Sequence, residues 1–453
     1  MSLIYSFNKL SQFFINQNFK CIYSYYLVLI ILIFPVIISC FNFLAWNFCA
    51  KDLSYDEIVE FLPTYGYLSV EPDSIWNIDI AAIVYKNDTD GFFKRNIMNL
   101  VTILISYYNE NMNLDIFSQR SNIFLRDFQR GKFINVTLCT YDPTTTENKC
   151  LGDNILTKVL IGPTAEDGLI KSKVSIESSR INRLNAKNNN MFYIMTNLDE
   201  RRDSMIIKNK GSNTNSEGES LVTASFLNYD RFNYINLIPY KGISVISDID
   251  DTIKVTQVGN HAKLLEHTFL KEFQIVPEVY DLYKQWNIDL KNRGENIHFH
   301  YVSSSPWPMA NILSDWIRNV KYPSGTMHLK KFRLELFEPW GIDLTLFNLF
   351  KNPTKYKVST IANIISNFPS RKFILVGDSS EKDPEIYGII TRMLPEKIVC
   401  AIIRNVSTRP IHMSRMQQAF LNVSSSKYVT IDSSLNVKRQ LNIHKINKNG
   451  NCF

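Results

Sequence analysis

The chain has 453 residues, of which 45% are hydrophobic and 21% are charged. This length accommodates two or three domains, and this composition is that of an ordinary globular protein. The net charge of +7 is small and the basic residues are scattered, so a nucleic-acid partner is not expected. A mildly basic chain of this kind instead suits anionic lipids or phosphorylated substrates.

An apolar segment near the N-terminus predicts a transmembrane signal anchor. Residues 25–46, which begin YYLVLIILIF, contain no formal charge and follow a short segment, residues 1–24, that carries lysines. A helix of about twenty apolar residues spans the hydrocarbon core of a bilayer. Because acidic residues follow the segment, the positive-inside rule predicts a cytoplasmic N-terminus. A cleaved signal peptide, which would give a secreted protein, and a buried core helix are the alternatives.

Two further patterns agree with a body in an oxidising compartment. Four asparagines begin N-x-[ST] sequons: Asn87, Asn135, Asn405 and Asn422. Cys139 and Cys150 are close enough in sequence to pair across a short loop, and such bonds persist in oxidising compartments. We therefore expect a single-pass protein of the endomembrane system with a luminal or extracellular body.

The rest of the chain divides into three regions. Residues 51–239 contain strand-like runs such as FINVTLCTY and MFYIMTNL and predict a β-rich accessory domain. Residues 240–405 alternate short apolar runs, among them ISVIS, IHFHYVS and KFILVGD, with helical patterns. This alternation predicts a doubly wound α/β domain with a parallel sheet. Residues 406–453 are rich in Ser, Asn and Lys and predict an extended or disordered tail.

Polar side chains follow three of the predicted parallel strands. The residues concerned are Asp248-Ile249-Asp250-Asp251-Thr252, Ser303 to Ser305, and Asp378 with Asp383, while Lys355 and Lys357 begin a predicted helix. The carboxyl ends of parallel strands meet at one edge of a sheet. Carboxylates, hydroxyls and an ammonium are the groups that Mg²⁺-assisted phosphoryl transfer needs. An EF-hand is excluded, because Ile253 and Gly259 occupy the positions that require Gly and Glu.

Four sequence blocks carry a family resemblance. SDIDDTIKVTQV, HYVSSSPWPM, YPSGTMHLKKFRL and FPSRKFILVGDSSEKDPEIYG, in this order, resemble the catalytic domain of the actin-patch-associated phosphatidate phosphatase family. This family belongs to the haloacid-dehalogenase-like superfamily, and the resemblance covers most of residues 240–405. It implies a haloacid-dehalogenase-like fold, a Mg²⁺ cofactor and the phospholipid phosphatidate as substrate. The chain departs from the pattern at Ser380, where the family usually has Gly.

The resemblance also implies catalytic roles. Asp248 is implied to be the nucleophile that receives the phosphoryl group, which divides one difficult displacement into two easier ones. Asp250 is implied to be the general acid and base, a role that needs a pKa raised by its neighbours. Ser303 would donate a hydrogen bond to the phosphoryl oxygens. Lys357, in preference to Lys355, would neutralise charge on the nucleophile and the phosphate.

A metal site is implied by the same blocks. Mg²⁺ would be held by Asp248, by Asp378 and by the backbone carbonyl of Asp250, and Asp383 would support or join this set. Thr252 completes the D-x-D-x-T motif and is counted with the catalytic residues. Several of these residues have plainer interpretations: Asp248, Asp250 and Asp383 as capping residues, Ser303 as a turn residue, and Lys357 as a solvated residue at a helix start.

Other polar and aromatic residues have structural interpretations. His298 and His300 alternate along one predicted strand, and we interpret them as structural rather than catalytic. Trp307, Trp316 and Trp340 are interpreted as core residues in preference to contacts with a lipid tail.

Three functions are considered. The leading one is a membrane-anchored, Mg²⁺-dependent phosphatidate phosphatase that acts on a membrane phospholipid and releases diacylglycerol. The second keeps the enzyme but changes the substrate to a soluble phosphoester or a phosphoprotein. The third is a non-catalytic, membrane-tethered scaffold. The sequence by itself assigns no protein partner and no task to residues 51–239.

Overall fold

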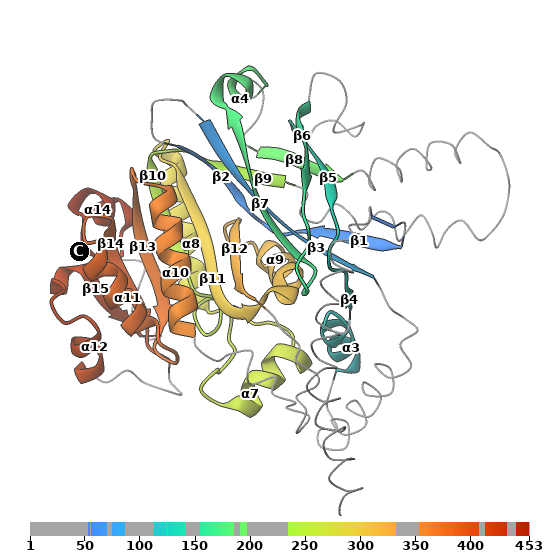
Figure 1. Cartoon of the computed structure of the whole chain (residues 1–453). Coiled ribbons are helices and arrows are strands. Elements are labelled where there is room, and N and C mark those ends of the chain that lie inside the picture. The colour runs from blue at the N-terminus through green and yellow to red at the C-terminus, as the bar shows by residue number, and fades with distance from the viewer. Residues whose placement is uncertain are drawn as a thin grey trace, which may run out of the picture.

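The computed structural model describes most of the chain after residue 53. The described residues are 53–54, 56–69, 75–86, 113–124, 126–140, 155–184, 191–196, 234–331, 353–406, 413–432 and 441–452. They form a nine-stranded sheet and a six-stranded sheet, which lie side by side (Figure 1).

The six-stranded sheet is parallel throughout. Its strands are β10 (Gly242–Ser247), β11 (Ile297–Pro306), β12 (Gly325–Lys330), β13 (Arg371–Asp378), β14 (Ile398–Arg404) and β15 (Tyr428–Ile431). Their order across the sheet is β12-β11-β10-β13-β14-β15, and every neighbouring pair is parallel. This is the doubly wound order, with its switch point between β10 and β13. The predicted α/β class with a parallel sheet is confirmed.

Helices cover both faces of the parallel sheet. The helices are α8 (Pro277–Asn292), α9 (Ala310–Asn319), α10 (Pro353–Asn367), α11 (Asp383–Met393), α12 (Met413–Ala419) and α14 (Ile443–Asn449). Buried residues of α8, α9 and α14 share one hydrophobic cluster, and those of α10, α11 and α12 share another. Both faces of the sheet are therefore buried, which explains the continuous apolar runs of its strands.

The nine-stranded sheet is built from the N-terminal region. Its strands are β1 (Glu57–Phe61), β2 (Tyr65–Leu68), β3 (Ile75–Lys86), β4 (Asp127–Phe128), β5 (Ile134–Thr140), β6 (Ile155–Ile161), β7 (Leu169–Glu177), β8 (Met191–Thr196) and β9 (Tyr234–Ile238). The order is β1-β3-β2-β9-β8-β5-β6, and β4 and β7 also pair with β3. Helices α3 (Leu114–Asn122) and α4 (Ser178–Leu184) accompany it. Residues such as Ile78, Val136 and Phe192 form its own core.

The two sheets are joined by direct packing. Ile83 and Leu169 of the N-terminal sheet belong to the same hydrophobic cluster as α8 and α9. The backbone N–H of Met327 in β12 donates to the carbonyl of Pro63 at 3.0 Å. Burial of shared apolar surface is the main stabilising contribution to such a contact. The N-terminal sheet therefore packs directly against the parallel-sheet unit.

The C-terminal region differs from the expected extended tail. Strand β15 adds to the edge of the parallel sheet, and Ile443 and Ile446 of α14 are fully buried in the cluster that contains α8. A disulfide joins Cys400 of β14 to Cys452. A few apolar side chains in a polar stretch thus suffice, because the sheet already offers a surface on which to bury them.

The predicted localisation is wrong. Within the described part of the chain, none of the helices has the length and apolar character needed to cross a bilayer. The prediction of a single-pass membrane protein with a luminal or extracellular catalytic domain is corrected on this finding. The predicted anchor itself, residues 25–46, lies outside the described residues. Cys139 is disulfide-bonded, but its predicted partner Cys150 also lies outside them.

Candidate active site

The acidic motif lies at the switch point of the parallel sheet. Asp248 directly follows β10, and its backbone N–H donates to the carbonyl of Val376 in β13 at 2.9 Å. The chain then turns sharply, with Asp251 at a positive φ of 57°. The Asp251 carboxylate accepts hydrogen bonds from the backbone N–H groups of residues 256 to 258. Asp251 therefore holds the turn and leaves Asp248 and Asp250 to face the site.

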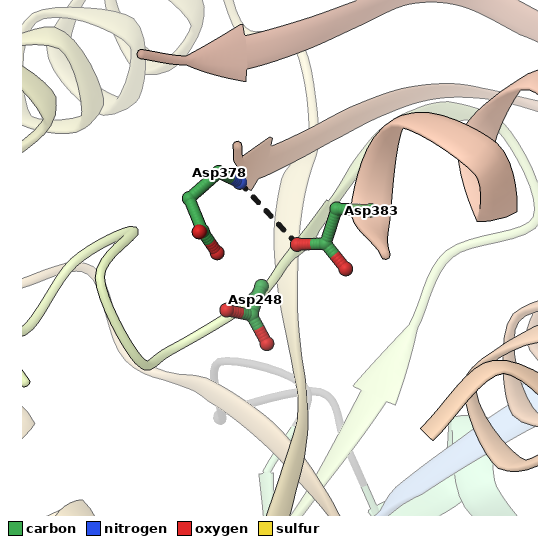
Figure 2. Close-up of side chains that lie close together, drawn as sticks. All are labelled: Asp248, Asp378 and Asp383. Carbon is green, nitrogen blue, oxygen red and sulfur yellow. Dashed lines mark hydrogen bonds between the residues drawn. The ribbon is translucent and has the colours of Figure 1, made fainter. Parts of the chain in front are cut away.

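Three carboxylates converge at this point. Asp248, Asp378 at the end of β13, and Asp383 at the start of α11 each offer an oxygen within 4.8 Å of the other two. Figure 2 shows their side chains turned toward one another, with the backbone N–H of Asp378 donating to Asp383 Oδ2 at 3.3 Å. All three are buried. Crowded buried carboxylates are unfavourable unless cations or protons compensate for them.

Lys357 supplies one of these cations. Its Nζ lies 2.8 Å from Asp248 Oδ1, 2.7 Å from Asp383 Oδ1 and 3.4 Å from Glu381 Oε2. Burial by itself lowers the pKa of Lys357, but Asp248, Asp383 and Glu381 outweigh burial and raise that pKa well above its ordinary value. Lys355 lies exposed two residues earlier on α10. The structure thus brings Lys357, and not Lys355, into the acidic cluster.

One lysine does not balance the carboxylates. Burial raises the pKa of Asp248 well above its ordinary value, with further increases from Asp383 and Asp378, while Lys357 opposes the shift. Burial likewise raises the pKa of Asp378, and Asp383 and Glu381 add to the increase. The site is therefore electrostatically prepared for an additional cation. Its three carboxylates present the hard oxygen ligands that Mg²⁺ prefers.

Asp250 occupies a separate polar environment beside the cluster. Its Oδ1 lies 2.7 Å from Lys254 Nζ and accepts a hydrogen bond from Thr256 Oγ1 at 2.8 Å. Its Oδ2 accepts from Ser305 Oγ at 2.8 Å and from Ser303 Oγ at 3.1 Å. Burial alone raises the pKa of Asp250, yet Lys254 and these hydrogen bonds prevail and lower it to about 2. This result contradicts the raised pKa expected from the sequence.

The other predicted site residues lie close to these groups. Thr252 Oγ1 donates to Asp248 Oδ2 at 3.4 Å and to Asp378 Oδ2 at 3.5 Å. Ser380, which replaces the usual Gly, donates its backbone N–H to Asp378 Oδ1 at 2.6 Å and its hydroxyl to the same oxygen. Ser303 contacts Asp250 rather than the carboxylate cluster. The structure therefore forms two adjoining groups, one around Asp248 and one around Asp250.

Sequence reasoning missed three residues that complete these groups, namely Lys254, Thr256 and Glu381. It named Ser305 with the other serines of its strand but assigned the role to Ser303, whereas both hydroxyls donate to Asp250. The three missed residues lie inside the sequence blocks described above, and that proximity is the signal that could have identified them. Their partners depend on side-chain directions in turns, which have no periodicity from which to predict contacts.

The fold and the site together define the class of this protein. It contains a doubly wound α/β unit with a carboxylate-rich centre at the switch point, where such sheets bind their ligands. Residues 243–405 match the profile of the phosphatidate phosphatase APP1 catalytic domain. This part of the chain is therefore similar to that family's catalytic domain, as its sequence blocks predicted.

Two curated relatives extend the comparison. The chain is 33% identical over 196 residues to phosphatidate phosphatase APP1 of Saccharomyces cerevisiae. This alignment covers 42% of this chain and 31% of the relative. It is 32% identical over 180 residues to an uncharacterized protein of Schizosaccharomyces pombe. This alignment covers 38% of this chain and 27% of that protein. The chain therefore spans about a third or less of each relative.

Among solved structures, a ferredoxin-NADP+ reductase from Plasmodium falciparum aligns with 76% of this chain and 92% of its own at 8% identity. Its TM-score of 0.15 is too low to indicate a shared fold.

Proposed function

We propose that this chain is a Mg²⁺-dependent phosphatidate phosphatase with a haloacid-dehalogenase-like catalytic domain. It would hydrolyse phosphatidate to diacylglycerol and phosphate through an aspartyl-phosphate on Asp248. The observation that carries the proposal is the buried Asp248 at the end of β10, with Lys357 at 2.8 Å and two further carboxylates beside it, within the segment that matches the family. The substrate is proposed from the name of the yeast relative.

The chain's own residues supply a nucleophile and its orientation. An Asp248 oxygen attacks phosphorus as the bond from phosphorus to the lipid oxygen breaks. Lys357 and Thr252 hold the Asp248 carboxylate in place, at 2.8 Å and 3.4 Å, so little reorganisation is needed at the moment of attack. Water then cleaves the aspartyl-phosphate, releases phosphate and restores Asp248.

Asp250 handles protons in this scheme. With a pKa of about 2 it is a carboxylate in the free protein, which suits the base that accepts a proton from the attacking water. Delivery of a proton to the leaving oxygen needs the protonated form. A phosphate placed beside Asp250 adds negative charge and raises the pKa of this carboxyl, which favours that form in the complex.

Asp248, Asp378 and Asp383 would hold Mg²⁺, since their buried oxygens form a compact set of hard ligands. When bound, this ion would neutralise charge on the phosphoryl oxygens and make the phosphorus more electrophilic. The proposed partner is a phospholipid surface that presents phosphatidate.

The test is phosphate release from phosphatidate in mixed micelles by the full chain, with Mg²⁺ or with chelator. We expect activity that requires Mg²⁺ and that falls by at least about 10³-fold in Asp248→Asn. Lys357→Met should also be nearly inactive. The matched control is Lys355→Met, because Lys355 lies exposed on the same helix, and it should keep wild-type activity.

Two results would redirect the assignment. Hydrolysis of p-nitrophenyl phosphate without hydrolysis of phosphatidate would keep the chemistry and favour a soluble phosphoester or a phosphoprotein as substrate. If the folded protein releases phosphate from neither substrate in the presence of Mg²⁺, a non-catalytic scaffold would be favoured.

A further inference from the structure

A cavity of about 500 Å³ lies between the two sheets. On one side it is lined by residues of β3 and β7, and on the other by residues of β12, α10 and the short 3₁₀ helix η4 (Trp307–Met309). This volume is within the range of about 300–1,000 Å³ that is typical of small-molecule sites. The cavity therefore exists only because the N-terminal sheet packs on the catalytic unit.

The cavity adjoins the candidate active site. Trp307 lines it and lies two residues after Ser305, which contacts Asp250. Tyr356 lines it and directly precedes Lys357 on α10. Leu329 lines it and is the register partner of Ser303 in the neighbouring strand. Near neighbours in sequence and in strand register thus link the wall of the cavity to the residues that contact Asp248 and Asp250.

The walls of the cavity are divided by polarity. Leu169, Trp307, Ala310 and Leu329 belong to one hydrophobic cluster, so they form a continuous apolar wall. Along β7 the side chains of residues 169, 171 and 173 share one face of the sheet. The two later positions are lysines, and Lys173 lies 3.8 Å from Asp79. The cavity is therefore apolar near Trp307 and Leu329 and polar near Lys171 and Lys173.

Trp307 carries an unused hydrogen-bond donor in this wall. Its side chain is only 2% exposed, and its indole Nε1 has no hydrogen-bond partner among the described residues. A buried donor without an acceptor costs roughly 1–3 kcal/mol. A ligand that placed an oxygen near this nitrogen would recover that free energy, so the wall favours an apolar group with an adjoining acceptor.

Lys171 adds a cation to the same cavity. It lines the cavity at the register position opposite Ala81, and the structure records no ion pair for it within the described ranges. Lys171 keeps an exposed position on β7. Partial desolvation and the nearby Lys331 lower its pKa, while Asp167 and Asp79 oppose the shift. An ester or glycerol oxygen could accept a hydrogen bond from it, and an anionic lipid would be attracted to it.

We infer that this cavity binds the acyl-glycerol part of the substrate. The inference rests on the proposed function. A fatty acyl chain would lie against Leu169, Trp307 and Leu329, and its ester carbonyl would accept from the Trp307 N–H. A small soluble phosphoester has no acyl chain to cover the apolar wall, so the cavity discriminates in favour of lipid phosphates. The N-terminal sheet would therefore form half of the lipid-binding site.

The experiment fills the cavity. Ala81 lies in its wall, opposite Lys171 on the neighbouring strand, so Ala81→Phe adds a ring on the side of β3 that lines the cavity. The kcat/KM for water-soluble dioctanoyl phosphatidate, divided by that for p-nitrophenyl phosphate, should fall about tenfold or more, which corresponds to about 1.4 kcal/mol. Ser175→Phe adds the same ring at an exposed position of β7 and should leave the ratio unchanged.

A second variant keeps the test decisive if Ala81→Phe does not fold. Trp307→Phe retains an aromatic ring but removes the N–H donor, and the same ratio should fall severalfold. An unchanged ratio in a folded Ala81→Phe or in Trp307→Phe, with a wild type active on dioctanoyl phosphatidate, would overturn the inference and leave the proposed function intact. A wild type that hydrolyses only p-nitrophenyl phosphate would overturn the proposed function and this inference with it.

Discussion

Acidification from pH 7 to pH 5 should destabilise this protein through three histidines, of which His300 is fully buried and His298 and His328 are half-buried. His298 and His300 in β11 and His328 in β12 cluster between the two sheets, and the rings of His298 and His300 lie 4.7 Å apart. Burial lowers the pKa of both His298 and His328 to about 3, and it lowers that of His300 well below its ordinary value. All three are therefore neutral in the folded protein at either pH.

The magnitude follows from linkage. In the unfolded chain a histidine has a pKa of about 6.5 and takes up a proton at pH 5, while the folded form does not. The stability contribution is thus fully present above about pH 6.5 and is lost as the pH falls toward 3. At pH 5 one such histidine lowers the free energy of unfolding by about 2 kcal/mol. This figure changes little if the folded pKa is 4 instead of 3, because pH 5 lies above both values.

The assay is urea unfolding at pH 7 and pH 5, followed by tryptophan fluorescence, for the wild type and His298→Phe. His298 suits the substitution, because its Nε2 has no hydrogen-bond partner among the described residues and the ring already packs in an aromatic cluster. The acid-induced loss of unfolding free energy should be about 2 kcal/mol smaller in the variant. An equal loss in both proteins would show that His298 is not held neutral in the fold.

Three further changes have defined outcomes. Gly377→Ala would place a Cβ 2.3 Å from Asp383 Oδ2, so Mg²⁺-dependent phosphate release should fall at least about tenfold while circular dichroism stays unchanged. Arg120→Met removes hydrogen bonds from the guanidinium to the carbonyls of Thr268 and Lys271, at 2.8 and 2.7 Å. The free energy of unfolding should fall by about 1.5 kcal/mol or more, and a much smaller fall would show that these hydrogen bonds contribute little. Cys452→Ser removes a cross-link to Cys400 that spans 52 residues, so the free energy of unfolding should fall by about 2–4 kcal/mol, as measured by urea unfolding.

The sequence by itself determined the α/β class and the place of the acidic motif. Continuous apolar runs alternate with helical patterns, and parallel strands buried on both faces require such runs. Because Asp248 and Asp378 each come at the end of such a run, the shared direction of the strands places them at one edge. Both features follow from local periodicity and strand direction, so they could be predicted without knowledge of any tertiary contact.

Tertiary structure alone decided which side chains meet. Helical periodicity does not distinguish Lys355 from Lys357, and the preference for Lys357 came only from the family resemblance. The structure shows that Lys357 lies on the face of α10 that points to Asp248. The pKa of Asp250 is lowered rather than raised, because Lys254 folds back to 2.7 Å from it across a turn without periodicity. The cavity between the sheets likewise arises from residues far apart along the chain. Charge interactions and cavities depend on distances in space, and a periodic pattern specifies only the face of an element and not the partner that covers it.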